Sequence, residues 1–188
     1  MSTPRIVVAH GYNANPERNW FPWLVEQYGA ERVTVPAQTA PTEPRLEPWI
    51  DRIAAAIGGG GPDTIVIGHS LGCVTALRAL ARLERPWTLA GLILVAGFVD
   101  PLPGWPKLDE FVDEPIDVAP LIASIPRRTV FISDDDPGVP LELTRRLAQL
   151  LEAELITVPG AGHFSDATGF VEFPELVPVI ERMSGGVE

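Results

Sequence analysis

The pentapeptide Gly68-His69-Ser70-Leu71-Gly72 has the residue types and the spacing for acyl-transfer chemistry. An apolar run over 64–67 precedes it and a helical pattern over 71–82 follows, which predicts a serine on a sharp turn between a strand and a helix. Glycines on both sides leave room where a Cβ would collide. The turn exposes the serine hydroxyl and directs the first N–H groups of the helix at the carbon under attack. We interpret Ser70 as a nucleophile; the alternative is an ordinary turn with a serine cap.

A neutral serine hydroxyl needs a base, and imidazole is suited because its pKa lies near the working pH. The chain has three histidines. The turn directs His69 away from the serine hydroxyl. For His10 we favour a role in shaping the loop after the first strand over a role in the chemistry. His163 follows the last strand in a glycine-rich loop, from which its ring can reach across the strand ends. We therefore expect His163 to be the base rather than a solvent-exposed loop residue.

The acid that orients the histidine should follow a strand between the serine and the histidine. Three consecutive aspartates, at 134–136, are in that place. We assign Asp136 as the acid with Asp135 as the second choice, and the alternative is a solvated turn whose carboxylates cap the next helix. Asp100 follows the preceding strand and is another possible position, whereas Asp166 is too close in sequence to the histidine to be preferred.

The negative charge that develops on the substrate's carbonyl oxygen requires two hydrogen-bond donors. The loop after the first strand, 10–13, should supply the second one, because Gly11 allows a close backbone approach. We predict an oxyanion hole formed by the backbone N–H groups of Tyr12 and Leu71.

Aromatic residues on loops at this edge are candidates for a substrate pocket. Phe98, Trp105 and Phe164 lie after strands or in the connecting loops and could form an apolar wall. Tryptophans at helical spacing are more often core residues, so for Trp20, Trp23 and Trp49 we favour the core.

The elements that must position these residues alternate along the chain. Short apolar runs predict strands over 5–9, 32–35, 64–67, 91–96, 129–133 and 154–158. Helical patterns lie over 19–28, 45–57, 71–83, 141–151 and 174–183. Continuous apolar strands are covered on both faces, which predicts an α/β fold with a doubly wound, mostly parallel sheet of about six strands. Ligands bind at the carboxyl ends of such strands, where every candidate residue falls.

One connection, 97–127, is long and rich in proline, with a weak helical stretch near 107–112. Hydrolases of this architecture carry a lid or cap at this place. The segment is too short for a full cap domain, so we expect a modest flap on a single domain spanning 1–188.

Composition narrows the classes of partner. A formal net charge of -11 argues against nucleic acid or an anionic membrane surface as partner. The single cysteine, Cys73, excludes an intramolecular disulfide and a cysteine-based zinc site, and we expect it to be a core thiol. We find neither a signal sequence nor a membrane-spanning run, so we expect a cytoplasmic protein.

The motifs described above, taken in their order along the chain, resemble a family of small, capless serine hydrolases. This family is related to retinoblastoma-binding protein 9 and includes bacterial YdeN-like members. The resemblance covers nearly the whole chain, through the blocks 10–12, 19–24, 44–49, 68–73, 94–98, 134–140 and 162–164. It implies an α/β-hydrolase fold, no cofactor, and Ser70, Asp136 and His163 as a catalytic triad. The family's acid stands just before an x-x-x-Pro pattern, which here ends at Pro140. Members look like esterases or amidases acting on small acyl compounds.

The resulting hypothesis is a serine hydrolase that cleaves small esters without a cofactor or a metal, with a small acyl compound as its partner. Two alternatives stay open. One is a catalytically idle protein that binds a partner through 97–127, and the other is a peptidase or thioesterase that uses the same three residues.

Overall fold

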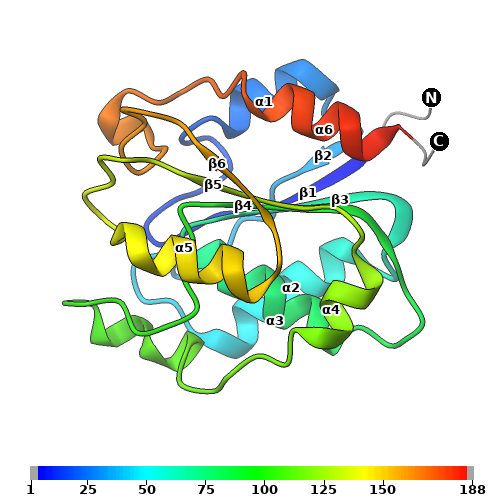
Figure 1. Ribbon diagram of the computed structural model, residues 1–188, viewed down its shortest axis with the longest axis horizontal. Helices are drawn as coiled ribbons and strands as arrows, with labels where there is room; N and C mark the ends of the chain where they lie inside the picture. The colour runs from blue at the N-terminus through cyan, green and yellow to red at the C-terminus, as the bar shows by residue number, and fades with distance from the viewer. Residues whose placement is uncertain (1–3, 186–188) are drawn as a thin grey trace.

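The computed structural model describes residues 4–185, and these form a six-stranded sheet in which all neighbouring strands are parallel (Figure 1). The strand order is β2-β1-β3-β4-β5-β6. The strands are β1 (Arg5–Ala9), β2 (Val33–Thr34), β3 (Gly61–His69), β4 (Leu89–Val95), β5 (Arg128–Ile132) and β6 (Glu154–Thr157). The predicted α/β architecture with a doubly wound sheet is therefore confirmed.

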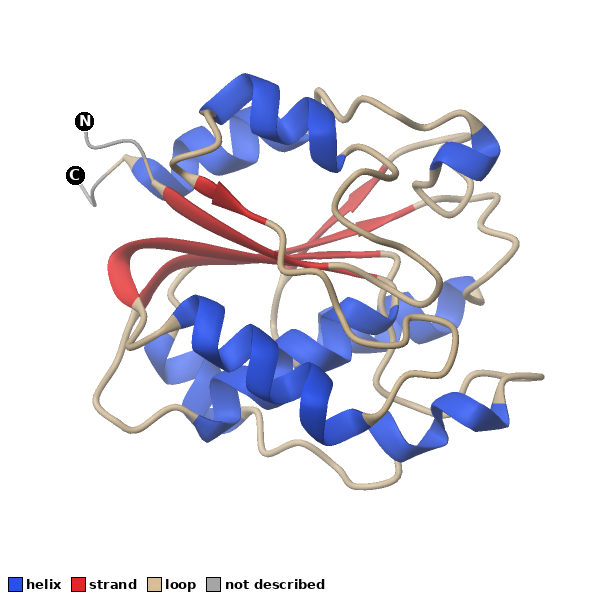
Figure 2. Ribbon diagram, turned by 180° about the vertical axis from the view of Figure 1, so that it is seen from behind, coloured by secondary structure: helices blue, strands red, loops and turns tan. Residues whose placement is uncertain are grey.

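Helices cover both faces of the sheet. Helices α1 and α6 lie on one face, and α2, α3, α4 and α5 lie on the other (Figures 1 and 2). The helices are α1 (Phe21–Tyr28), α2 (Leu46–Ile57), α3 (Leu71–Arg82), α4 (Ala119–Ser124), α5 (Leu141–Leu150) and α6 (Leu176–Ser184), and two short 3-10 helices are η1 (Pro106–Phe111) and η2 (Asp166–Thr168). Over residues 4–185, none of the helices has the length and apolar character needed to cross a membrane.

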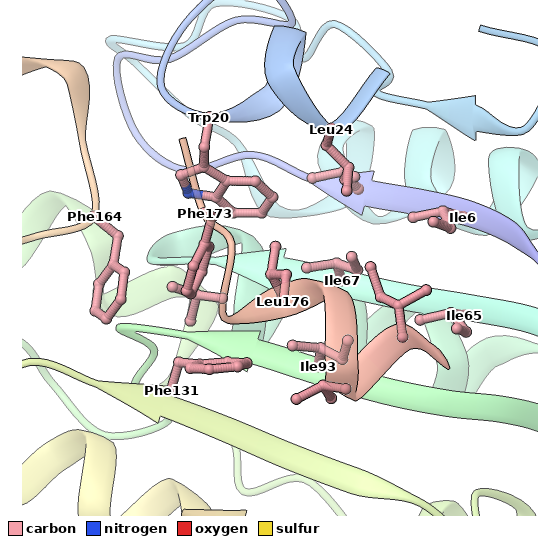
Figure 3. Close-up of a cluster of buried hydrophobic side chains, with 14 of the residues drawn as sticks. Ile6, Trp20, Leu24, Ile65, Ile67, Ile93, Phe131, Phe164, Phe173 and Leu176 are labelled. Atoms are coloured by element: carbon pink, nitrogen blue, oxygen red, sulfur yellow. The ribbon is translucent and has the colours of Figure 1, made fainter. Parts of the chain in front are cut away.

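Side chains of the strands pack into two separate core layers, one on each face of the sheet. In β1, Ile6 and Val8 belong to the cluster under α1 and α6, whereas Val7 and Ala9 belong to the cluster under α2, α3 and α5. Successive side chains of a strand point to opposite faces, so a continuous apolar run fills both layers. Figure 3 shows the first cluster, in which isoleucines of β1, β3 and β4 meet side chains from α1 and α6.

The centre of the sheet contains the point at which the strand order reverses. From β1 the chain moves outward to β2, and it then returns to form β3 on the other side of β1. The loops after β1 and β3 leave in different directions there, which opens a crevice at the carboxyl ends of the two strands. This arrangement brings the 10–13 loop beside Ser70.

The proline-rich segment between β4 and β5 contains η1 and α4 and has its own small core. Leu102, Leu108 and Phe111 are buried against Leu71 at the start of α3 and Trp49 of α2. The weak helical stretch predicted at 107–112 is η1. Helix α4 was not predicted, because its six residues are too few to show a periodicity.

Candidate active site

Ser70 stands at the junction of β3 and α3 in a strained backbone conformation, with φ 55° and ψ -124°. Its N–H donates to the Val95 carbonyl at 2.9 Å. A Cβ at Gly68 would lie 2.7 Å from the Cα of Cys73, and one at Gly72 would overlap the Ala9 carbonyl. The turn can therefore form only because these two positions lack a side chain.

His163 is held by a carboxylate that is itself fixed. The Nδ1 atom of His163 lies 2.9 and 3.0 Å from the two carboxyl oxygens of Asp136. One of these oxygens also accepts the N–H groups of Gly138 and Val139 at 2.7 and 3.0 Å. The Asp136 side chain is only 5% exposed, against 21% for His163. Because Nδ1 donates its proton to the carboxylate, Nε2 is the atom left to take up a proton.

The neighbouring aspartates hold the backbone of the histidine loop. Asp135 accepts hydrogen bonds from the Ser133 hydroxyl at 2.6 Å and the Gly162 N–H at 2.8 Å, and these bonds lower the pKa of its carboxyl. Asp134 accepts from the Gly160 N–H at 2.9 Å. The structure therefore places Asp136, and not Asp135, against the imidazole.

The two less favoured carboxylates both pair with arginines. Asp100 lies 2.7 Å from Arg146. Asp166 forms a two-point pair with Arg18, at 2.7 and 2.9 Å, which lowers the pKa of its carboxyl.

His69 has a structural role that the sequence did not indicate. Its Nε2 atom lies 2.8 Å from the backbone carbonyl of His163, and the two rings are 5.1 Å apart. Burial lowers the pKa of His69 to about 3, so the ring is neutral and its Nε2–H donates to that carbonyl. His69 thus ties the end of β3 to the loop that carries His163. No spacing in the sequence signals this contact.

His10 shapes the loop after β1, as expected from the sequence. Its Nδ1 atom lies 3.0 Å from the Gly11 carbonyl, and its Nε2 atom accepts the Gln38 N–H at 3.0 Å. Burial lowers the pKa of His10, which keeps the ring neutral in this arrangement. A Cβ at Gly11 would lie 2.9 Å from the Cβ of Ser70, so the loop approaches the serine closely.

The backbone N–H groups of Tyr12 and Leu71 lie next to Ser70. Over residues 4–185, neither the N–H of Tyr12 nor that of Leu71 donates a hydrogen bond. In the same part of the chain, the Ser70 hydroxyl and the His163 Nε2 atom also make no hydrogen bond. Hydrogen bonds of this kind commonly tighten only when a substrate is present.

Two cavities open beside Ser70. Both are lined by the same four residues, Tyr12, Ser70, Trp105 and His163. The first, which we call the apolar cavity, has a volume of about 160 Å³ and is completed by Leu102, Leu108, Gly138 and Val139. The second, the polar cavity, has a volume of about 370 Å³ and is completed by Gly11, Asn13, Ala14, Arg18, Asn19, His69, Ser165, Asp166 and Ala167.

Two of the three expected pocket residues are elsewhere. Trp105 lines both cavities, whereas Phe98 and Phe164 are fully buried and line neither. Phe98 packs inside the small core of the flap, and Phe164 points into the cluster of Phe173 and Phe131 (Figure 3). We correct the expectation for these two phenylalanines, because an aromatic on a loop can fold inward as readily as it can face a ligand. Leu102, Leu108 and Val139 were missed as lining residues.

Cys73 is packed in the core one turn into α3. Its thiol donates to the Val95 carbonyl at 3.5 Å, and burial raises its pKa, so it is a protonated and inert group. In the part of the chain that the structure describes, no cluster of three or more His, Cys, Asp or Glu side chains is placed to hold a metal ion.

Comparisons with known proteins identify the family of this chain. A family model described as serine hydrolase matches residues 6–182. The chain is 36% identical to YdeN of Bacillus subtilis (strain 168) over 180 residues, which cover 95% of each chain. It is 25% identical to the serine hydrolase RBBP9 of Rattus norvegicus over 182 residues, covering 95% of this chain and 93% of the relative.

Solved structures show the same relationship. The crystal structure of the ydeN gene product of B. subtilis has a TM-score of 0.90 at 36% identity and covers 96% of this chain and 98% of that one. The α/β-hydrolase MGS-M2 from a deep-sea metagenome has a TM-score of 0.66 at 14% identity, with 100% and 92% covered, and shows the fold alone. This chain therefore belongs to the serine hydrolase family and has the α/β-hydrolase fold.

Proposed function

We propose that this protein hydrolyses small carboxylic esters through a Ser70-His163-Asp136 triad and an acyl-enzyme. Ser70 Oγ bonds to the carbonyl carbon while His163 Nε2 takes the hydroxyl proton. The carbon–oxygen bond to the leaving alcohol then breaks, and the alcohol departs with that proton. Water then attacks the acyl carbon while His163 Nε2 takes one of its protons. The bond from the acyl carbon to Ser70 Oγ breaks, the carboxylic acid leaves, and His163 returns the proton to Ser70.

The observation that carries this proposal is the fixed pair of His163 and Asp136 at the mouth of cavities that Ser70 also lines. The buried carboxylate selects the tautomer with the proton on Nδ1 and stabilises the imidazolium that forms during attack. A structural ion pair alone would not require a serine in a strained turn beside it, because such strain persists where it is part of a mechanism.

The backbone N–H groups of Tyr12 and Leu71 serve as the oxyanion hole in this proposal. Both belong to residues that adjoin the serine in space, and both lack a partner over residues 4–185. Leu71 is the first residue of α3, so its N–H also contributes the positive end of the helix dipole. Loss of one such donor lowers the rate by about a hundred- to a thousandfold in known enzymes.

Labelling with an alkyl fluorophosphonate tests the proposal. We expect one adduct on Ser70 in the wild-type protein, located by intact mass and peptide mapping. Ser70→Ala should lose the adduct, and His163→Ala should acquire it far more slowly. Circular dichroism of both variants shows whether they are folded. A folded wild-type protein that takes up no label would favour a catalytically idle binding protein.

A further inference from the structure

The apolar cavity has the size and lining for a short hydrocarbon group. Its walls include Leu102 and Leu108 of the flap and Val139 of the loop after Asp136, each at most 7% exposed. Its volume is about 160 Å³. An apolar cavity of about 150 Å³ in another protein accommodates benzene. A chain of about six carbons is therefore the largest group that this cavity would enclose, and a long fatty chain would extend into solvent.

The polar cavity carries polar side chains that the apolar cavity lacks, although most of its lining surface is apolar as well. Asn13, Arg18, Asn19, Ser165 and Asp166 supply its polar groups. Arg18 and Asp166 form a two-point pair in its wall, so the cation and the anion neutralise one another. The cavity consequently suits an uncharged group that carries hydroxyls or amides more than it suits a free anion.

Two aromatic rings line both cavities beside the serine. Tyr12 and Trp105 pack edge to face with 5.2 Å between their ring centroids. Ser70 and His163 line both cavities, so an ester bond positioned at Ser70 has one of its two parts in each of them.

The order of the chemical steps decides which part occupies which cavity. The alcohol leaves with the proton from His163, and water must then reach the same histidine while the acyl group stays bonded to Ser70. Water enters readily through a polar passage, and an apolar group is retained in an apolar one. The polar cavity is also the larger of the two, which suits a path for release and hydration.

On this basis, and resting on the proposed function, we propose that the enzyme cleaves esters of short apolar acids with polar, uncharged alcohols. The acyl group of up to about six carbons occupies the cavity of Leu102, Leu108 and Val139. The alcohol occupies the cavity beside the Arg18–Asp166 pair.

Two esters that exchange the same groups across the bond test this orientation. Hexanoyl glycerol has an apolar acyl part and a polar alcohol, and hexyl glycerate has the reverse. The concentration of active sites is first measured by fluorophosphonate labelling of Ser70. We expect kcat/KM for hexanoyl glycerol to exceed that for hexyl glycerate at least tenfold. Dodecanoyl glycerol should give no further gain over the hexanoyl ester.

Variants of the flap test the location of the acyl group. Leu102→Trp fills the apolar cavity and Leu102→Ala enlarges it, and the readout is the ratio of kcat/KM for 4-nitrophenyl hexanoate to that for the acetate. We expect the ratio to fall at least fivefold in Leu102→Trp. In Leu102→Ala, kcat/KM for 4-nitrophenyl octanoate relative to the hexanoate should rise, because the enlarged cavity encloses a longer chain. Val112→Ala is the matched control, because Val112 lies in the same flap core at the same 7% exposure but lines neither cavity. It should leave the ratio unchanged.

The outcomes separate this inference from the function on which it rests. Equal or reversed preference for the two esters, or a ratio unaffected by both Leu102 variants, would overturn the inference. Labelling of Ser70 without turnover of either ester would overturn it too, while leaving the nucleophile in place. Failure to label Ser70 at all would instead overturn the proposed function.

Discussion

The three consecutive aspartates after β5 have three different partners. Asp134 and Asp135 accept backbone N–H groups of the histidine loop, and Asp136 contacts the imidazole with both oxygens. Repulsion between adjacent carboxylates is offset because each one accepts hydrogen bonds from a different group. The same short stretch thus fixes both the backbone and the ring of His163.

Asparagine substitutions should separate these roles. Asp136→Asn retains the shape but removes the charge that stabilises the imidazolium and the acceptor that selects its tautomer. We expect kcat for a 4-nitrophenyl ester to fall by about a thousand- to ten-thousandfold, as in other enzymes with this arrangement. Asp135→Asn is the matched control and should retain activity within about tenfold, since it weakens only the hold on the loop. Similar losses in both variants would contradict the assignment of Asp136.

His69 couples acid stability to the geometry of the site. His69 is 3% exposed, and over residues 4–185 its buried Nδ1 atom has no hydrogen-bond partner. The folded protein keeps this ring neutral down to a pKa of about 3, whereas an unfolded chain would bind the proton at a pKa of about 6.5. Between these values the unfolded state binds more protons, so the free energy of unfolding falls as the pH is lowered.

This difference predicts a measurable loss at pH 5. The contribution of His69 should reduce the free energy of unfolding by about 2 kcal/mol between pH 7.5 and pH 5. His69→Gln keeps a donor for the His163 carbonyl but has no titrating group. Urea denaturation of both proteins at the two pH values should therefore show a smaller loss in the variant. Parallel losses in the two proteins would argue against a neutral His69 in the fold.

At the scale of elements, the site is assembled from loops at one edge of the sheet. The loops after β1, β3, β5 and β6 each supply one part, and the flap between β4 and β5 covers them. The flap is attached across the site by Lys107 of η1. Its ammonium nitrogen lies 2.5 Å from the Tyr12 hydroxyl and 4.2 and 5.2 Å from the ring centroids of Tyr12 and Trp105.

Removal of this cation should loosen the flap without changing the chemistry. Exposed cation–π contacts contribute about 0.5–1 kcal/mol, so we expect Lys107→Met to raise KM for a neutral ester by about two- to fivefold. The value of kcat should stay within twofold. Glu110→Gln is the control, because Glu110 lies on the same 3-10 helix and faces Arg45 at 3.8 Å instead of the site. An unchanged KM in Lys107→Met would show that the contact does not hold the flap.

At the scale of the whole molecule, the sheet, α1 and the histidine loop meet in one aromatic cluster. Phe173 is fully buried, and its ring centroid lies 4.9 Å from that of Phe131, 5.2 Å from Phe164 and 5.4 Å from Trp20 (Figure 3). Phe164 directly follows His163. The packing of the core cluster under α1 and α6 therefore also supports the loop that carries His163.

Truncation of this ring should destabilise the whole protein. Phe173→Ala removes a fully buried aromatic side chain and leaves a cavity, which typically costs about 3–5 kcal/mol. The urea concentration at the midpoint of denaturation should therefore fall in proportion to this loss in the free energy of unfolding. Val171→Ala, at a nearby position that is 50% exposed, should change stability by less than about 0.5 kcal/mol. A small effect of Phe173→Ala would mean that the cluster can collapse around the gap.

Local patterns in the sequence predicted the strands, the parallel sheet and the turn at Ser70. The positions of His163 and of the acidic stretch followed from the order of elements in this fold. Phe98 and Phe164 could not be assigned in the same way, since the direction of a loop side chain depends on its neighbours in space. Local patterns also did not predict helix α4 or the early start of β3 at Gly61. The bounds of short helices and of strand ends depend on the segments that pack against them or pair with them.

By itself, the sequence determined which residues have side chains suited to acyl transfer and the edge of the sheet at which they gather. Periodicity and strained glycine turns are local properties, so they can be read along the chain. Only the tertiary structure decided that Asp136 holds the imidazole, that His69 ties down its loop, and that two unlike cavities flank Ser70. Each of these contacts joins residues distant in the sequence, and the folded backbone alone sets their distances and the space between them.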